Sequence, residues 1–266
     1  MTLPCGKCIG CRIQRTAEWK VRLMHEARYH ENNCFITLTY RDEDLPLCRS
    51  LCKQILQRFI KRLRKYLGEQ KIKYYACGEY GSLFEREHYH LIVFGWQPPL
   101  EDLYLAYIKK GKKYYGSRII STLWTHGYNT VGTVTPDSCQ YVAGYVKKGP
   151  NITNLKRMLK GRLQPFALQS TGLGAYYAYE NREKIKANLS VIEGKKNFGL
   201  PRYYQRIIGV DTDMLREKSL KKEYERYQFM KDLGWSHNDI MRIFKEESNQ
   251  KEIDLVTKDN IKELRK

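Results

Sequence analysis

The stretch EREHYHLIVFGW, residues 85–96, decides the fold, because it places two histidines at the start of a run apolar enough to form a buried strand. On a strand, side chains two residues apart project from the same face, so His88 and His90 point together while Tyr89 points away. Two imidazoles on one rigid face can bind one cation. The spacing therefore predicts a metal site, and the simpler alternative is two aromatic side chains packed at a strand end.

A carboxylate is expected to join the histidines. Glu79 ends the preceding predicted strand, and an antiparallel hairpin closed by residues 80–87 brings it back beside the pair. Glu85 and Glu87 are rivals, but in the closing loop solvation is the more common state of a carboxylate. A set of two histidines and one carboxylate leaves coordination positions open for a phosphate oxygen, which suits Mg²⁺ or Mn²⁺.

Strand and helix patterns surround this hairpin without a regular alternation of strand and helix. We therefore expect an α+β domain with a mainly antiparallel sheet, helices on one face and the other face available for a ligand. Thr135 and Pro136 are typical of a helix start, and Gly149 and Pro150 of a helix end. Strands are predicted at 34–40, 71–80, 88–96 and 128–134, helices at 13–27, 53–67, 117–127 and 135–148, a hairpin within 191–205 and helices from 213 onward.

The charge balance indicates a polyanionic partner. The chain has 48 Lys and Arg against 29 Asp and Glu, a formal net charge of +19. Such a charge favours nucleic acid, and an anionic membrane surface ranks behind it because no basic amphipathic segment stands apart. No apolar run is long enough to span a bilayer, the N-terminus lacks a signal-peptide pattern, and no GxxxxGK[ST] motif occurs. We expect a soluble cytosolic protein without its own ATP-driven motor.

Two tyrosines on the predicted helix 135–148 are candidate nucleophiles. Tyr141 and Tyr145 stand four residues apart and thus share one helix face. Lys147 and Lys148 follow within a turn, where an ammonium can stabilise a phenolate or a phosphate oxygen. The usual alternative is a tyrosine face packed into the core.

The N-terminal cysteines form a separate candidate site. Cys5, Cys8 and Cys11 supply three thiols at equal spacing, which fits a structural zinc, an iron–sulfur cluster or simply reduced thiols. Eight cysteines in a cytosolic chain of this length are expected to be thiols or ligands, not disulfides. A fourth ligand could come from Cys34, Cys48, Cys52, Cys77, Cys139 or His25.

Several blocks together carry a family resemblance. In order and spacing, the chain resembles the three motifs of HUH-type rolling-circle replication initiators with FITLTY at 35–40, GEYG and HYHLIVFG within 78–95, and YVAGYVKK at 141–148. Additional blocks, among them PCGKCIGCR, LWTHGYNTVGTVT and GLGAYYAYENREK, are similar to the initiators of gokushovirus-type microviruses, which are small single-stranded DNA phages. The resemblance covers about residues 5 to 205.

The resemblance implies a fold and a set of site residues. The fold is an HUH endonuclease domain with a central five-stranded antiparallel sheet flanked by helices, the histidine pair on a central strand and the tyrosine helix beside it. The family usually approaches the histidines through a Gly-Arg-Pro-like segment, whereas this chain has FERE, so Glu87 remains a rival third ligand. The implied roles are metal ligands for His88, His90 and Glu79, nucleophiles for Tyr141 and Tyr145, and a Tyr-x-x-Lys lysine for Lys148.

The resemblance also implies the activity. It is a nick in single-stranded origin DNA through a covalent 5′-phosphotyrosine, with a free 3′ hydroxyl that primes host polymerase, assisted by host helicase in the cytoplasm of the bacterial host. The alternatives are a non-catalytic zinc-dependent nucleic-acid-binding protein and a transposase or plasmid relaxase with the same site. The expected organisation is a Cys-rich loop and helix at 1–33 that belongs to the catalytic domain, an endonuclease core at 34–205 and a helical charged extension at 206–266.

Overall fold

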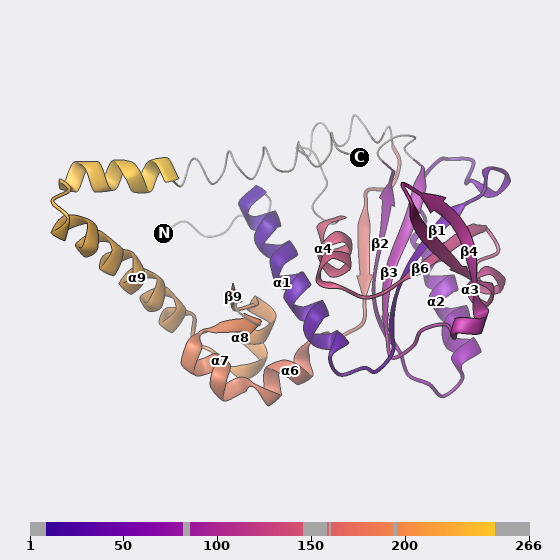
Figure 1. Cartoon of the computed structure of the whole chain (residues 1–266), viewed down its shortest axis with the longest axis horizontal. Helices are drawn as coiled ribbons and strands as arrows, with labels where there is room; N and C mark the ends of the chain where they lie inside the picture. The colour runs from indigo at the N-terminus through magenta and orange to yellow at the C-terminus, as the bar shows by residue number, and fades with distance from the viewer. Residues whose placement is uncertain (1–8, 82–85, 146–158, 160, 194–195, 248–266) are drawn as a thin grey trace. The chain divides into compact units, whose positions relative to one another are not determined.

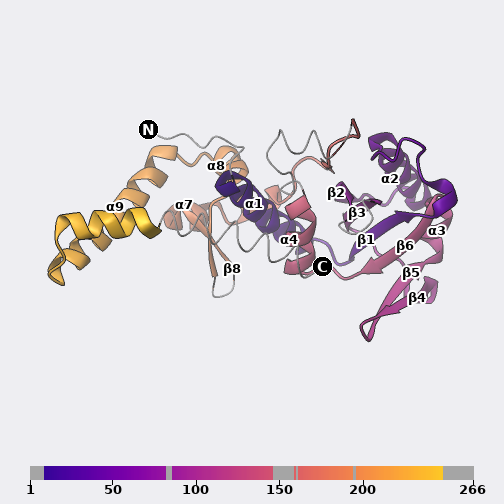
Figure 2. The same ribbon diagram turned by 90° about the horizontal axis from the view of Figure 1, so that it is seen from above.

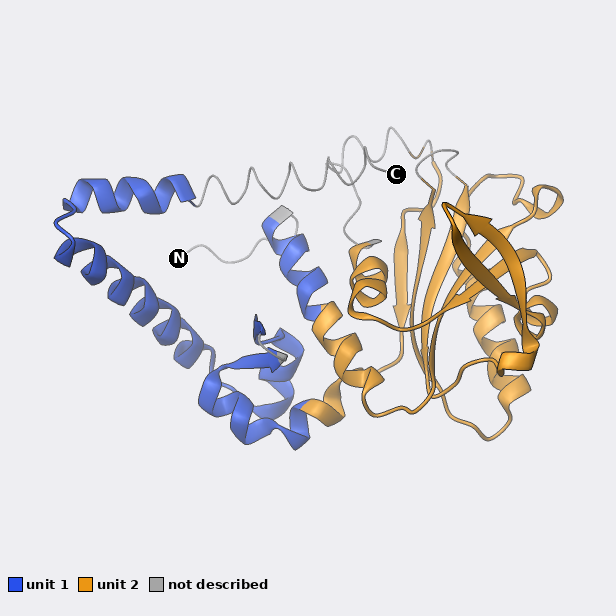
Figure 3. Ribbon diagram, in the orientation of Figure 1, with its two compact units in different colours: residues 1–18, 178–266 blue, residues 19–177 orange. Residues whose placement is uncertain are grey.

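The computed structural model describes residues 9–81, 86–145, 159, 161–193 and 196–247. The chain divides into two compact units, shown in Figure 3. The larger unit comprises Trp19–Tyr177, and the smaller unit comprises Met1–Glu18 and Ala178–Lys266. The three segments expected from the sequence stay a prediction.

The larger unit is built on a seven-stranded sheet in the order β4-β5-β6-β1-β3-β2-β7, in which every strand pair is antiparallel (Figure 1). The α+β class and the antiparallel sheet are therefore confirmed, but the sheet has more strands than the five that the resemblance implied. Four of the seven were predicted from their residues, and the unpredicted β4, β5 and β7 lie at the two edges. The strands are β1 (Asn33–Tyr40), β2 (Lys73–Tyr80), β3 (Glu87–Phe94), β4 (Leu103–Lys109), β5 (Lys112–Ser117), β6 (Gly127–Gly132) and β7 (Phe166–Gln169).

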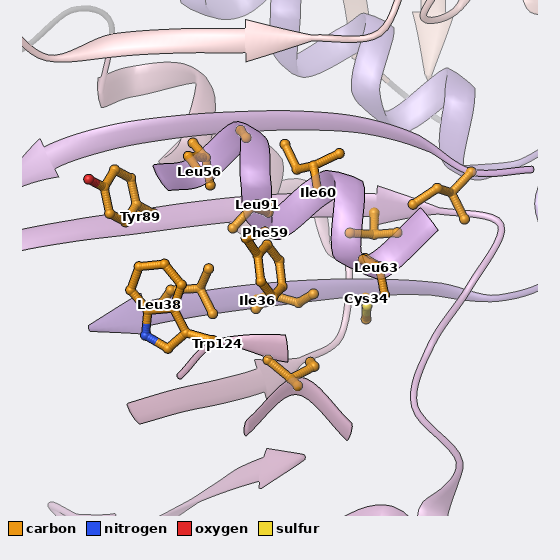
Figure 4. Packing of buried hydrophobic residues seen from close by; sticks show 14 of the residues in the cluster. Cys34, Ile36, Leu38, Leu56, Phe59, Ile60, Leu63, Tyr89, Leu91 and Trp124 are labelled. Carbon is orange, nitrogen blue, oxygen red and sulfur yellow. The ribbon is translucent and has the colours of Figure 1, made fainter. Parts of the chain in front are cut away.

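One face of the sheet is covered by α2 (Lys53–Leu67) and α3 (Arg118–Leu123). The apolar stripe of α2 packs on side chains that alternate along β1 and β3, as Figure 4 shows. Burying an aliphatic or aromatic side chain of this size contributes about 1.5–3 kcal/mol, so this cluster is the main source of stability. It includes Leu56, Phe59, Ile60 and Leu63 of α2, Cys34, Ile36 and Leu38 of β1, Tyr89 and Leu91 of β3, and Trp124.

The other face is also covered, which corrects the expectation of helices on one face only. The C-terminal part of α1 (Ile9–Ala27) and α4 (Pro136–Tyr145) pack against it through Leu23 and Val142. The reason lies in β3, where Leu91, Ile92, Val93 and Phe94 are all buried, so that both faces of this strand need an apolar cover. A ligand therefore meets this face only beyond the helices.

The start of α4 follows the predicted capping. The backbone N–H of Ser138 donates to Thr135 Oγ1 over 3.1 Å, and the N–H of Thr135 donates to Ser138 Oγ over 2.7 Å. Thr135 is thus the N-cap, and Pro136 takes the first helical position. The predicted end of this helix at Gly149 and Pro150 lies outside the described residues.

The smaller unit is mainly helical in its described part. A two-stranded sheet of β8 (Ser190–Glu193) and β9 (Lys196–Gly199) confirms the predicted hairpin. The helical extension is confirmed as far as residue 247, with a second helix at 237–247. No described helix combines the length and apolar character needed to cross a bilayer. The helices here are α7 (Arg182–Asn188), α8 (Arg202–Ile208) and α9 (Thr212–Asp232), while α6 (Ala175–Glu180) begins in the larger unit.

Candidate functional site

The two histidines lie on an interior strand of the sheet. β3 pairs with β1 on one side and with β2 on the other. His90 stands opposite Thr37 and Cys77, and His88 opposite Thr39 and Glu79. The two imidazole rings share one face, with 6.3 Å between their centroids. The predicted pairing of Glu79 with this strand is therefore confirmed.

Two threonines of β1 hold the imidazoles. Thr37 Oγ1 lies 3.0 Å from His90 Nδ1, and Thr39 Oγ1 lies 3.1 Å from His88 Nδ1. A hydrogen bond at Nδ1 fixes the plane of the ring, and with the proton on Nδ1 the lone pair of Nε2 is available to a ligand. The ladder between β1 and β3 thus orients both rings at once.

Glu79 is the carboxylate that reaches the pair. Its Oε1 lies 3.0 Å from His90 Nε2, and the two residues are only 7% and 5% exposed. Removal of both groups from water strengthens their electrostatic interaction. The structure therefore places an acidic and an imidazole group in direct contact at the predicted position.

Glu87 does not join this group, which corrects both readings of that residue. It is the first residue of β3 and is 0% exposed, so it is not a solvated loop carboxylate. Because it precedes His88 by one position, its side chain lies on the opposite face, with Tyr89 and Leu91. Glu85, the other rival, lies outside the described residues.

The environment of His88 keeps its imidazole neutral. Burial lowers the pKa of His88 to about 4, and the neighbouring His90 and Arg86 add to the effect. At neutral pH the ring is therefore in the form that binds metal ions. Gly81 packs closely on this ring, since a Cβ at Gly81 would lie 2.9 Å from His88 Nε2.

The donor set fits a divalent cation in its chemistry. Within the described ranges, no three His, Cys, Asp or Glu side chains are grouped as a preformed metal site, and His90 instead contacts Glu79 directly. Two neutral imidazoles held at Nδ1 and one buried carboxylate are nevertheless the ligand types that Mn²⁺ and related ions take. Binding of a cation would replace the contact between His90 and Glu79.

Tyr141 comes from α4 to the same place. Its ring centroid lies 5.1 Å from that of His90, with the rings nearly perpendicular at 85°, and 6.2 Å from that of Phe35. The residue is 40% exposed, so solvent and a ligand can reach it. The side chain of Tyr145 and all of Lys148 lie outside the described part, and their predicted roles are untouched.

The cysteine site stays a prediction, because Cys5 and Cys8 lie outside the described residues. Cys11 lies in the first turns of α1. Two suggested partners are poor ligands: burial raises the pKa of the Cys34 thiol far above its ordinary value and that of Cys139 to about 12. His25 is fully buried and stacks on Tyr177 at 3.5 Å.

Comparison with known proteins places these motifs in a family. A family model described as replication-associated protein ORF2 matches residues 33–150, the segment that holds the described site. The chain is 38% identical over 219 residues to replication-associated protein ORF2 of Spiroplasma virus 4, covering 77% of this chain and 67% of that protein. The chain belongs to this family of replication-associated proteins.

Two further relatives agree with this assignment. Replication-associated protein ORF4 of Chlamydia phage 1 is 35% identical over 218 residues, covering 77% of this chain and 53% of that protein. Replication-associated protein VP4 of Bdellovibrio phage phiMH2K is 39% identical over 153 residues, covering 54% and 48%. The chain thus spans about half the length of these two relatives. No solved structure matches it.

Membership in this family confirms the resemblance drawn from the motifs, but three site residues were not foreseen. Thr37 and Thr39 were read only as part of a β-branched strand, and Gly81 only as part of a motif. The signal available was the alternation of Thr37 and Thr39, which puts two hydroxyls on one strand face. Their contact with the histidines depends on a pairing across about fifty residues of sequence, given by the fold.

Proposed function

We propose that this chain nicks and rejoins single-stranded DNA at a phage replication origin and so starts rolling-circle replication. The observation that carries the proposal is the approach of Tyr141, a partly exposed phenol, to the buried His90, which is held by Thr37 and Glu79. A nucleophile beside a candidate metal site is the arrangement that phosphoryl transfer through a covalent intermediate needs.

His88, His90 and Glu79 are the residues that would hold Mg²⁺ or Mn²⁺. When bound, the cation supplies positive charge to a non-bridging phosphate oxygen and so stabilises the charge that develops during displacement. The threonine contacts keep both Nε2 atoms directed away from β1. The neutral state of His88 avoids repulsion with a second positive charge.

Tyr141 is the proposed nucleophile of the first cut. Its phenolic oxygen attacks the scissile phosphorus, a bond forms between tyrosine oxygen and phosphorus, and the bond between phosphorus and the 3′ oxygen breaks. The phenol proton passes to solvent, which reaches the exposed side of Tyr141, and the departing 3′ oxygen takes up a proton. Because one phosphate ester replaces another, the step needs no ATP, in agreement with the missing GxxxxGK[ST] motif.

Tyr145 and Lys148 complete the proposed cycle. Tyr145 follows Tyr141 by one helical turn and would take over a second strand transfer, which allows cleavage and rejoining within one protein. Lys148 would stabilise a phenolate or phosphate oxygen as the lysine of a Tyr-x-x-Lys motif.

The proposed partners follow from this chemistry. The net charge of +19 favours capture of single-stranded DNA, and the free 3′ end requires a host polymerase and helicase in the host cytoplasm. The family match supports a replication role over the transposase, relaxase and non-catalytic zinc-protein alternatives.

The test is formation of a protein–DNA adduct that survives SDS. Labelled single-stranded oligonucleotides that tile the phage genome are incubated with the protein and Mn²⁺, with and without EDTA. We expect one oligonucleotide to give a metal-dependent adduct that Tyr141→Phe and His90→Ala reduce at least a hundredfold. Tyr66→Phe, an exposed tyrosine of α2 on the opposite sheet face, is the matched control. An undiminished adduct in the double variant Tyr141→Phe and Tyr145→Phe contradicts the proposal.

A further inference from the structure

The hairpin of β4 and β5 projects beyond the sheet. Lys110 and Gly111 form its two-residue turn, with φ angles of 51° and 74°, the left-handed values that tight hairpin turns require. β5 is in register with β6 at Tyr115 opposite Val131, and the distal part of the hairpin extends past the sheet edge (Figure 2). This part of the hairpin is held by its own pairing and offers its side chains to a partner.

The exposed side chains of the hairpin combine aromatic and basic groups. Tyr107 is 47% exposed, and its ring stacks on Tyr114 with centroids 4.7 Å apart. This stack holds the Tyr107 ring in place before any ligand arrives. Lysines surround the turn, and all of them are exposed: Lys109, Lys110, Lys112 and Lys113.

A cavity of about 490 Å³ lies between this hairpin and the centre of the sheet. Among its lining residues, Tyr104 and Tyr107 come from β4, Tyr128 and Thr130 from β6, and Thr37 and Thr39 from β1. The threonines are the same residues that hold the imidazoles of His90 and His88. The cavity therefore shares a wall with the histidine pair.

We propose that this cavity and the basic hairpin bind the nucleotides next to the scissile phosphate, with a base against Tyr107 and Tyr128 and the following phosphates against the lysines. This inference rests on the proposed function, since it places the strand by the position of the histidine pair. The volume lies in the range of pockets that hold small organic ligands. Tyr128 is 66% exposed, so its ring face is available for a base.

The occupant is a single strand because the surface offers what a single strand presents. Unpaired bases stack on aromatic rings with little dependence on sequence, and lysines follow the phosphates. Duplex DNA keeps its bases stacked on one another and could use only the lysines. A single-stranded ligand should therefore depend on the tyrosines and the lysines, and a duplex on the lysines alone.

The test measures binding, separately from nicking. Fluorescence anisotropy with a fluorescein-labelled 20-nucleotide single strand, without metal, compares wild type with Tyr107→Ala plus Tyr128→Ala. We expect binding at least tenfold weaker, which equals about 1.4 kcal/mol. Tyr107→Phe plus Tyr128→Phe should restore it, because the ring and not the hydroxyl stacks, and Tyr66→Ala should have no effect.

The lysines are tested through the salt dependence of the same binding. Lys112→Gln plus Lys113→Gln should lower the slope of log K against log salt by about one to two, because each phosphate contact contributes about 0.7 for a single strand. Lys61→Gln plus Lys65→Gln on α2 removes the same charge from the opposite face and should change the slope less.

Several outcomes overturn the inference. Wild-type affinity in the double alanine variant, equal effects of the two lysine pairs, or absence of single-strand binding by the wild type would each do so. Circular dichroism and thermal melting show whether a variant is folded, and Tyr128→Ala alone, at a highly exposed position, serves if the double variant is not. Failure of the adduct assay with intact Tyr107-dependent binding would instead contradict the proposed nuclease while leaving this surface in place.

Discussion

Replacement of Thr37 by valine should weaken metal binding without disturbing the sheet. Valine has nearly the shape of threonine and suits a strand, but it cannot accept the hydrogen bond from His90 Nδ1, which now spans 3.0 Å. His90 is 5% exposed, so no bulk water replaces the hydroxyl. Loss of a partner for a buried polar group costs about 1–3 kcal/mol, and loss of such a support typically lowers metal affinity by about 10–100-fold.

The measurement is isothermal titration of the protein with Mn²⁺ at pH 7.5. We expect the dissociation constant of Thr37→Val to rise by about 10–100-fold, or about 1.4–2.7 kcal/mol. Thr39→Val should act in the same direction through His88, whereas Thr133→Val, at an exposed threonine outside the strands, should match the wild type. Unchanged affinity in Thr37→Val, together with its loss in His90→Ala, would refute the reasoning that the threonines orient the ligands.

Three further perturbations test other parts of the structure. Gly81→Ala should reduce adduct formation about tenfold or more with little loss of stability, because the new Cβ would meet His88 Nε2 at 2.9 Å; an unchanged adduct yield counts against this contact. Burial, with a smaller effect of Arg28, lowers the pKa of His25 to about 3, so the unfolded state takes up the proton first as the pH falls below 6.5. The free energy of unfolding from urea titration should therefore drop between pH 6.5 and 4.5, and His25→Phe should reduce that drop by about 2–3 kcal/mol; an identical pH dependence contradicts it. Leu91→Ala should lower the free energy of unfolding by about 2–5 kcal/mol, since Leu91 is fully buried under α2, and a loss below 1 kcal/mol would show that the core is misassigned.

The sequence was most informative where one element carries its own pattern. The alternation of His88 and His90 on a strand, the apolar stripe of α2 and the cap of α4 each depend on neighbours within a few residues, and the structure confirms all three. Glu79 was also predictable, because a hairpin closed by a short loop fixes which residues meet.

What escaped prediction depends on partners far apart in sequence. The roles of Thr37 and Thr39 require the pairing of β1 with β3, and α4 reaches the histidine face only through tertiary packing. Glu87 was misread because the loop was expected to extend to it, whereas β3 begins there. The β4–β5 hairpin had a local signal in Lys110 and Gly111, but its exposed apolar residues do not show the alternation typical of a half-buried strand.

The central claim is that Tyr141 attacks the scissile phosphate beside the histidine pair. Its most direct test is mass spectrometry of the covalent adduct formed with single-stranded origin DNA and Mn²⁺, after digestion of both the protein and the DNA. The account predicts a residual nucleotide joined through its 5′ phosphate to the Tyr141 side chain in the first-cut product. A nucleotide on a residue outside α4, or linkage through a 3′ phosphate, would contradict it.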